Sequence, residues 1–171
     1  KISSSIQTKT KEGIPLKWLK GYSEGLIGVS PGAEGIIEHS LANEETEKAM
    51  EAIGMFQAIF GPENFYMSLQ VNGLVNRELV KNLAKQTNTL LVATNAVCYL
   101  KPEDAIAYEV LKAVNQGTKV NQNFTGENLN RNNYLKSGSE MKEMFQDIEE
   151  AIQNTLTIAA RCNVEIKMHQ S

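Results

Sequence analysis

Few side chains of this sequence combine the residue type and the spacing that a catalytic site needs. The segment 28–32 reads Gly-Val-Ser-Pro-Gly and has the spacing of a nucleophile elbow, with Ser30 in the nucleophile position. Pro31 argues against this role, because the residue after such a serine must enter a helix at a sharp turn. We therefore predict that Ser30 is a turn residue at the end of a strand.

The two histidines do not predict a metal site. His39 falls on a predicted helix and His169 lies in the C-terminal tail. Neither has a partner at ligand spacing, whereas transition-metal sites use three or four ligands drawn from His, Cys and carboxylates. We expect both histidines to be solvated or capping residues.

Cys98 is the more informative of the two cysteines, because it follows a predicted strand that ends at Thr94. Functional sites of parallel α/β folds lie at the carboxyl ends of the strands, where a thiol could act as a ligand or nucleophile. No histidine lies near Cys98 in the sequence, so burial as a small apolar side chain is the favoured interpretation. Cys162 continues the apolar face of the last predicted helix and is also predicted to lie in the core.

Three short apolar runs predict the strands that would position such a site, at residues 25–30, 65–70 and 89–94. The third run has no polar alternation, which is typical of a parallel strand buried on both faces. Helices are predicted between and after these strands, and a polar loop is predicted between residues 116 and 133. The helical signals are a run capped by Asn43 and ended by Gly61, a face of Val75, Leu79 and Leu83, a run from Pro102 to Gly117, a capping box of Ser137 and Glu140, and a face of Ile148, Ile152, Leu156 and Ala159.

The composition is that of an ordinary globular domain. The 171 residues are 42% hydrophobic and 22% charged, which is enough for one buried core without disulfides. The net charge of -3 argues against a strongly basic nucleic-acid module. No apolar run has the length of a membrane span and no signal peptide precedes the strands, so we expect a cytoplasmic protein with reduced thiols and no membrane partner.

Five segments follow one another in an order that resembles a known family: 17–27, 60–66, 92–105, 134–137 and 160–165. The second reads FGPENFY and the third reads VATNAVCYLKPEDA. The series resembles the PHP (polymerase and histidinol phosphatase) domain of the bacterial DNA polymerase III alpha subunit. The first segment resembles the form found in low-GC Gram-positive bacteria, and the resemblance extends over essentially the whole chain.

The resemblance implies an α/β fold: a partial PHP-type distorted barrel, of about seven βα units when complete, with a mostly parallel sheet flanked by helices. Residues 1–171 would be a single-domain fragment, the C-terminal part of a PHP domain. The N-terminal PHP strands and the polymerase core would lie outside the chain. Divalent metal (Mg²⁺) would belong to that core, and no cofactor is expected in this fragment.

The sequence departs from the family at its metal ligands. Members that bind metal carry an aspartate and a histidine at the positions of Ala96 and Cys98, and a ligating cysteine near the position of Gly32. Alanine and glycine offer no ligand atom, and one thiolate cannot hold zinc alone. The resemblance therefore implies a degenerate metal site, with no catalytic, cofactor-binding or metal-binding residue in this chain.

Three functions remain open at this stage. The first is a structural scaffold or docking surface of a replicative DNA polymerase, with the polymerase core and other replisome subunits as partners. The alternative is residual metal-dependent phosphoesterase activity of the complete domain, as a 3'-5' exonuclease or pyrophosphatase. A separate nucleic-acid-binding module is the third, which the charge and the lack of a basic and aromatic cluster oppose, so no direct DNA binding is expected. We also expect the isolated fragment to dimerise through the cut edge of its sheet or to cover that edge with its own termini.

Overall fold

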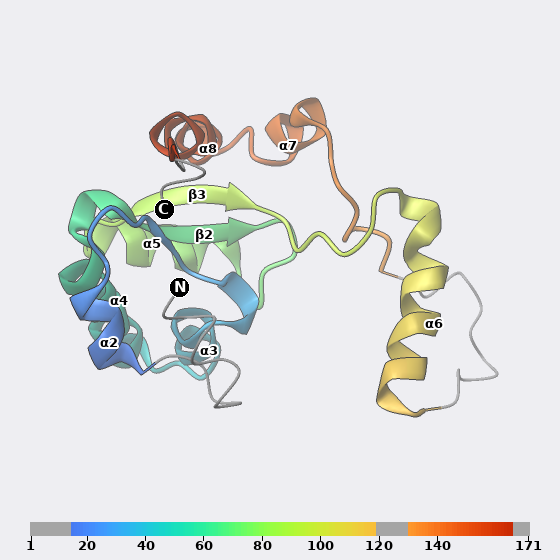
Figure 1. The fold of residues 1–171 in the computed structure, drawn as a ribbon, viewed down its shortest axis with the longest axis horizontal. Coiled ribbons are helices and arrows are strands. Elements are labelled where there is room, and N and C mark those ends of the chain that lie inside the picture. Colours follow the sequence, from blue (N-terminus) through green and yellow to red (C-terminus); the bar gives the residue numbers. More distant parts are fainter. Residues whose placement is uncertain (1–14, 119–129, 166–171) are drawn as a thin grey trace, which may run out of the picture.

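The computed structural model describes residues 15–118 and 130–165, which form an α/β fold around a three-stranded parallel sheet (Figure 1). The strands are β1 (Gly28–Val29), β2 (Phe65–Gln70) and β3 (Leu90–Thr94), in the order β1-β2-β3. Both pairings are parallel, and each connection between neighbouring strands contains helices. This confirms the predicted α/β class and the parallel sheet. His169 and most of the loop predicted between residues 116 and 133 lie outside the described residues.

The central strand β2 matches its prediction, and its residues from Phe65 to Leu69 are all buried. β3 starts one residue later than predicted, and only its Val92 and Ala93 are fully buried. β1 has two residues instead of the predicted six. Gly25 adopts a φ of 75° and the N–H of Leu26 closes a turn onto the carbonyl of Ser23, so residues 25–27 belong to a turn that leads into the strand.

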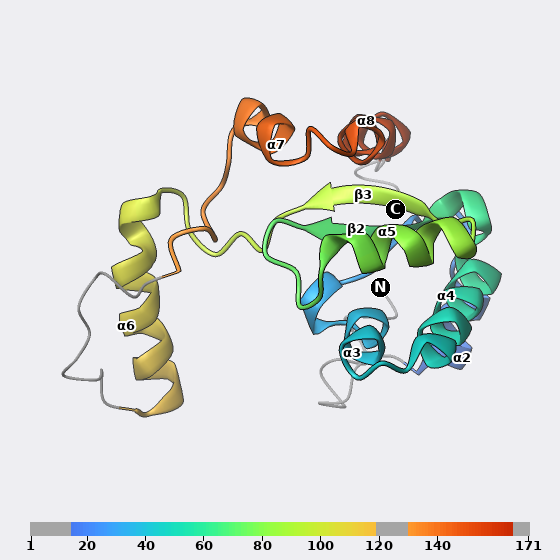
Figure 2. The ribbon, with the colours of Figure 1, turned by 180° about the vertical axis from the view of Figure 1, so that it is seen from behind.

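The described part of the chain contains seven helices, of which all but α6 lie around the sheet (Figures 1 and 2). The figures show α7 and α8 on one side of the sheet, α3 and α5 on the other, and α6 standing apart from both groups. Three single-turn 3-10 helices precede α3, β2 and α6. The helices are α2 (Leu16–Gly21), α3 (Ile36–Ala42), α4 (Thr46–Phe60), α5 (Arg77–Gln86), α6 (Ala105–Gln116), α7 (Gly138–Met144) and α8 (Glu149–Arg161); the 3-10 turns are η1 (Gly32–Glu34), η2 (Pro62–Asn64) and η3 (Pro102–Asp104).

One hydrophobic core joins the sheet to α3, α4, α5 and the C-terminal helices. Met67 and Leu69 of β2 pack in the same cluster as Ile53 of α4 and Leu83 of α5. Phe145, which follows α7, is completely buried in this cluster. α4 contributes one apolar face to this core: Ala49 and Ile53 are buried, and Phe56 and Phe60 pack against the cluster.

α8 covers the outer edge of β3. The carbonyl of Thr94 accepts the N–H of Val71 from the β2 side, so the carbonyl of Leu91 points the other way, along the free edge of the sheet. The side-chain amide of Asn154 in α8 donates to that Leu91 carbonyl at 2.8 Å. One exposed acceptor of the edge strand is therefore satisfied by a helix side chain.

Of the predicted helix-terminus residues, Ser137 and Gly61 are confirmed and Asn43 is not. The capping box of Ser137 and Glu140 is present at the start of α7, and Gly61 ends α4 with a φ of 88°. Asn43 does not cap α4: it ends α3, and its N–H donates to the carbonyls of His39 and Ser40. α4 begins three residues later, after a Glu44 in the left-handed region.

The apolar face of α5 is also different from the prediction. Val80, Leu83 and Ala84 are buried, whereas Leu79 is 49% exposed. The helix begins at Arg77, because the side chain of Asn76 accepts the N–H of Glu78 and acts as its N-cap. No helix in the described residues is long and apolar enough to cross a membrane.

Candidate functional site

The carboxyl ends of the three strands meet at one edge of the sheet, where parallel α/β folds place their sites. The chain leaves β1 through Pro31 and Gly32, leaves β2 after Gln70, and leaves β3 through Asn95 and Ala96. A cavity of about 350 Å³ lies between these segments. Its lining is Pro31, Ala33, Glu34, Gln70, Asn72, Asn95, Ala96, Asn130 and Asn133.

Gly32 is in the left-handed region, with a φ of 67°, at the start of η1. A Cβ atom at this position would lie 2.5 Å from Cδ of Gln70 and 2.7 Å from Oγ of Ser68. Both the backbone conformation and the close approach therefore require glycine here. The side chain of Gln70 occupies the space into which a ligating side chain at position 32 would extend.

The amides that line the cavity are engaged in holding the loops together. Gln70 accepts the N–H of Ala33 at 3.1 Å and donates to the carbonyl of Pro31 at 3.3 Å. Asn95 donates to the carbonyls of Asn132 and Tyr134 at 3.1 and 3.0 Å. These bonds tie the end of β1 to β2, and the end of β3 to the segment before α7.

The residues at this edge do not fit a metal ion. The side chain of Ala96 has no ligand atom, and Glu34 is the one carboxylate among the lining residues. Two buried hydroxyls in the described part of the chain, Ser68 Oγ and Thr94 Oγ1, have no hydrogen-bond partner, but neutral hydroxyls are not the ligands that transition metals select. Within residues 15–118 and 130–165, no three His, Cys, Asp or Glu side chains form a group that could bind a metal.

Cys98 lies beyond the cavity lining and is exposed, so its predicted burial is wrong. Its N–H donates to the carbonyl of Asn133 at 2.8 Å, which holds the residue in a surface connection rather than in the core. Interaction with the Cys98 side chain raises the pKa of Tyr108 in α6. Cys162 is exposed as well, because α8 ends at Arg161 and the chain turns away from the helix axis.

Ser30 and His39 have the structural roles that the sequence predicts. Ser30 follows β1, its N–H donates to the carbonyl of Tyr66, and its hydroxyl accepts the N–H of Ser68 at 2.9 Å. The serine therefore extends the pairing of β1 with β2, and its hydroxyl takes part in that pairing as a hydrogen-bond acceptor. His39 lies exposed on α3. The structure thus brings Gly32 and Ala96 to one edge, and places Cys98 outside the cavity.

The segment after β3 carries polar contacts that the sequence analysis missed. Tyr99 pairs with Tyr134 in an isolated parallel bridge, and the Tyr99 hydroxyl donates to the carbonyl of Asn130 at 2.7 Å. Tyr134 donates in turn to Glu140. The hydrogen bond of the Ser137 side chain, with those of Tyr134 and the Ser137 backbone, lowers the pKa of Glu140 to about 2. The only sequence signal for this arrangement is the capping box.

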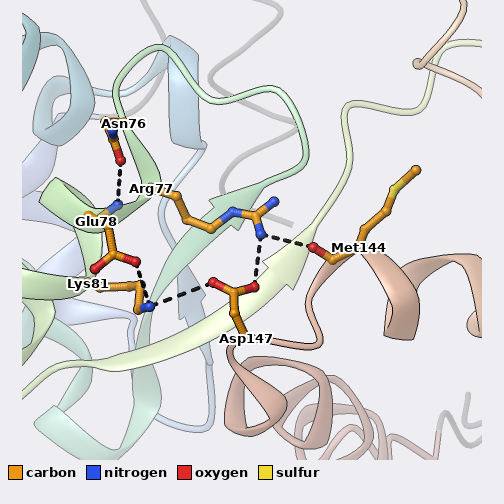
Figure 3. A network of polar contacts seen from close by, with 6 residues as sticks. All are labelled: Asn76, Arg77, Glu78, Lys81, Met144 and Asp147. Atoms are coloured by element: carbon orange, nitrogen blue, oxygen red, sulfur yellow. Dashed lines mark hydrogen bonds and ion pairs between the residues drawn. The ribbon is translucent and has the colours of Figure 1, made fainter.

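A second polar network joins α5 to the turn between α7 and α8 (Figure 3). Arg77 donates to the carbonyl of Met144 at 2.9 Å and to Oδ1 of Asp147 at 3.1 Å, and its guanidinium lies 4.5 Å from the centre of the Phe145 ring. Lys81 lies 3.6 Å from the other oxygen of Asp147. The network fixes the C-terminal helices on the rest of the fold, and no sequence pattern indicated it.

Glu38 of α3 is a buried carboxyl group. It is 3% exposed, and its Oε2 accepts the N–H of Leu74 in the loop after β2 at 2.9 Å. Burial raises the pKa of Glu38, and the Leu74 hydrogen bond opposes that shift. Together with Gln70 and Arg77, it lines a second cavity of about 350 Å³. The single carboxylate fastens the β2–α5 loop onto α3.

Comparisons with known proteins place these features in a family context. Residues 1–72 match the model of the PHP domain. The whole chain is 37% identical to a DNA polymerase III subunit alpha of Bacillus subtilis, and 88% of it is 37% identical to that of Pseudomonas aeruginosa. A Buchnera aphidicola subunit alpha is 32% identical over 90% of the chain. The chain spans 13–15% of the length of these relatives.

The matched PHP region contains β1, Gly32 and β2, and the similarity to the polymerase subunits continues through Ala96, Cys98 and α8. The chain is therefore related over its whole length to a region of DNA polymerase III alpha subunits, with its first 72 residues matching the PHP domain.

Proposed function

We propose that this chain is the C-terminal part of a degenerate PHP domain in a replicative DNA polymerase, of the low-GC Gram-positive type, and that it serves as a structural scaffold. Residues 1–171 then form one section of a distorted barrel of about seven βα units. The parent chain is a DNA-directed DNA polymerase, that is, a nucleotidyltransferase, and acts in the cytoplasm. The polymerase core of that chain is the main partner of this region and holds the Mg²⁺. Other replisome subunits are further partners.

One observation carries this proposal: the carboxyl edge of the sheet is built as a connector. Gln70 fills the space beside Gly32 and bonds both Pro31 and Ala33. Asn95 bonds the segment that leads into α7. Side chains that are hydrogen-bonded to their own backbone neighbours hold loops in place and have little capacity left for a substrate.

The test uses the complete parent polymerase. Ile53→Ala removes a fully buried side chain from α4, which costs about 2–5 kcal/mol of folding free energy. We expect a lower unfolding temperature and loss of polymerisation on heating, whereas the matched change Met50→Ala, at a 40% exposed position of the same helix, leaves both unchanged. Full polymerase activity and stability after deletion of this region would refute the scaffold role.

The phosphoesterase alternative has its own measurement. Ala96 in the lining and the filled space at Gly32 oppose it. Stoichiometric metal in the complete domain, together with metal-stimulated hydrolysis that Cys98→Ala abolishes, would establish the alternative in place of the scaffold.

A further inference from the structure

α6 has an apolar side that is turned away from the rest of the described chain. At 3.6 residues per turn, its apolar side chains cover a continuous arc of about 160°. The large ones are all 40–72% exposed, with Val110 at the lower limit and Val114 at the upper. The residues of this apolar arc are Ile106, Ala107, Val110, Leu111, Ala113 and Val114.

The opposite side of α6 faces the protein. Ala105 is 1% exposed, and Tyr108 lies one turn further along the same side. The centre of the Tyr108 ring lies 5.7 Å from the centre of the Tyr99 ring. Lys112, on the next turn of that side, lies 5.6 Å from the Tyr108 ring centre. α6 is thus held through its polar side, which reverses the usual orientation of an amphipathic surface helix.

Figures 1 and 2 show α6 at a distance from the sheet and from the other helices in both views. Among the described elements, its main neighbour is η3, the 3-10 turn that precedes it. The Schellman-type end at Gly117, which has a φ of 65°, and the Glu109–Lys112 ion pair stabilise the helix locally. A formed helix with an uncovered apolar arc is typical of an interaction surface.

We propose that the apolar arc of α6 docks against an apolar surface in the remainder of the parent polymerase chain. This inference rests on the proposed function and adds the surface through which the scaffold acts. The relatives are single subunits in which this region makes up 13–15% of the length, so most of such a chain lies outside the described fold.

The size of the arc favours this occupant over a second copy of the chain. Stable interfaces between separate proteins use roughly 20–30 residues on each side. One face of a 12-residue helix provides far fewer. Within one polypeptide the contact forms at a high effective concentration, so a small apolar surface is sufficient.

The experiment compares variants of the complete parent chain by hydrogen exchange with mass spectrometry. Val114→Glu and Leu111→Gln place polar groups on the arc, at positions that are 72% and 66% exposed and so do not disturb the described fold. Gln116→Glu is the matched control, because it adds the same charge to the last turn of α6 on the polar side. Light scattering gives the mass of each variant.

We expect both arc variants to raise the exchange rate of α6, and of one segment outside the 171 residues, by about tenfold or more, with no change in mass. Gln116→Glu should exchange as the unchanged protein does. Equal exchange in all variants would show that the arc faces water and would refute the docking. Loss of a dimer in the arc variants, without exchange changes elsewhere in the chain, would identify a second copy as the occupant. A parent chain without polymerase activity would refute the proposed function but would leave the exchange result valid.

Discussion

Replacing Gly32 tests the packing of Gln70 and Ser68 around this glycine. Gly32→Ala places a side chain at a φ of 67°, which costs roughly 1–2 kcal/mol. The new Cβ would lie 2.5 Å from Gln70 and 2.7 Å from Ser68, and such overpacking costs about 1–3 kcal/mol. We expect a total loss of about 2–5 kcal/mol. For a chain of 171 residues this lowers the unfolding temperature by roughly 4–20 °C.

A double-mutant cycle separates the two costs. Gln70→Ala removes the bonds to Pro31 and Ala33 and should cost about 1–2 kcal/mol. In Gly32→Ala/Gln70→Ala the contact with Gln70 is removed and only the Ser68 hydroxyl remains close, so the combined loss should be smaller than the sum by at least about 1 kcal/mol. Urea denaturation measures all three variants. Gly54→Ala is the control, because nothing lies within 4 Å of its Cβ position in α4, and it should stabilise by about 0.5–1 kcal/mol. Additive losses in the cycle would refute the packing explanation.

Three further predictions concern the polar groups. Arg77→Ala should cost about 2 kcal/mol in urea denaturation, because it removes two charge-assisted bonds and the contact with Phe145. Lys81→Ala should leave the midpoint of urea denaturation unchanged. Equal effects of the two variants would contradict the central role of Arg77 in the network. Because the pKa of Glu38 is raised in the folded protein, the free energy of unfolding should fall as pH rises from about 4.5 through that pKa. Glu38→Gln should remove this dependence on pH. An unchanged pH dependence in the variant would assign it to another group. Ser137→Ala should cost about 1 kcal/mol at neutral pH. Because the pKa of Glu140 is lowered to about 2, the stability from the capping box should be present above pH 4.5 and lost as pH falls toward 2. If the stability of Ser137→Ala falls in acid just as that of the unchanged protein does, this coupling is refuted.

Features that depend on local chemistry could be predicted from the sequence. The apolar run of β2 and the capping box at Ser137 need only neighbouring residues to specify them, and both are present in the structure. Gly61, which ends α4, could likewise be predicted from its neighbouring residues. The expected α/β class followed from these elements, because strands separated by helices pair in parallel.

Features that depend on distant parts of the chain could not be predicted. Asn43 has the chemistry of a helix cap, but the end of α3 already uses it. Gly32 follows a proline in the sequence, but glycine is needed there for its φ of 67° and for the approach of Gln70, 38 positions further along the chain. The periodicity of α6 gives its apolar stripe but not the direction in which the stripe points. For Cys98, the position after a strand was correct, and its exposure depends on the connection to Asn133.

The amide that Asn154 donates to Leu91 has a consequence for how copies of this sheet associate. β3 is covered by α8, so among the described strands only β1 offers backbone groups to another strand. A sheet with two open edges can add strands indefinitely and form a fibre, whereas a sheet with one open edge is complete once two copies have joined. Helix α8 therefore limits any edge-to-edge association of this fold to pairs. Asn154→Ala would weaken that limit without touching the core.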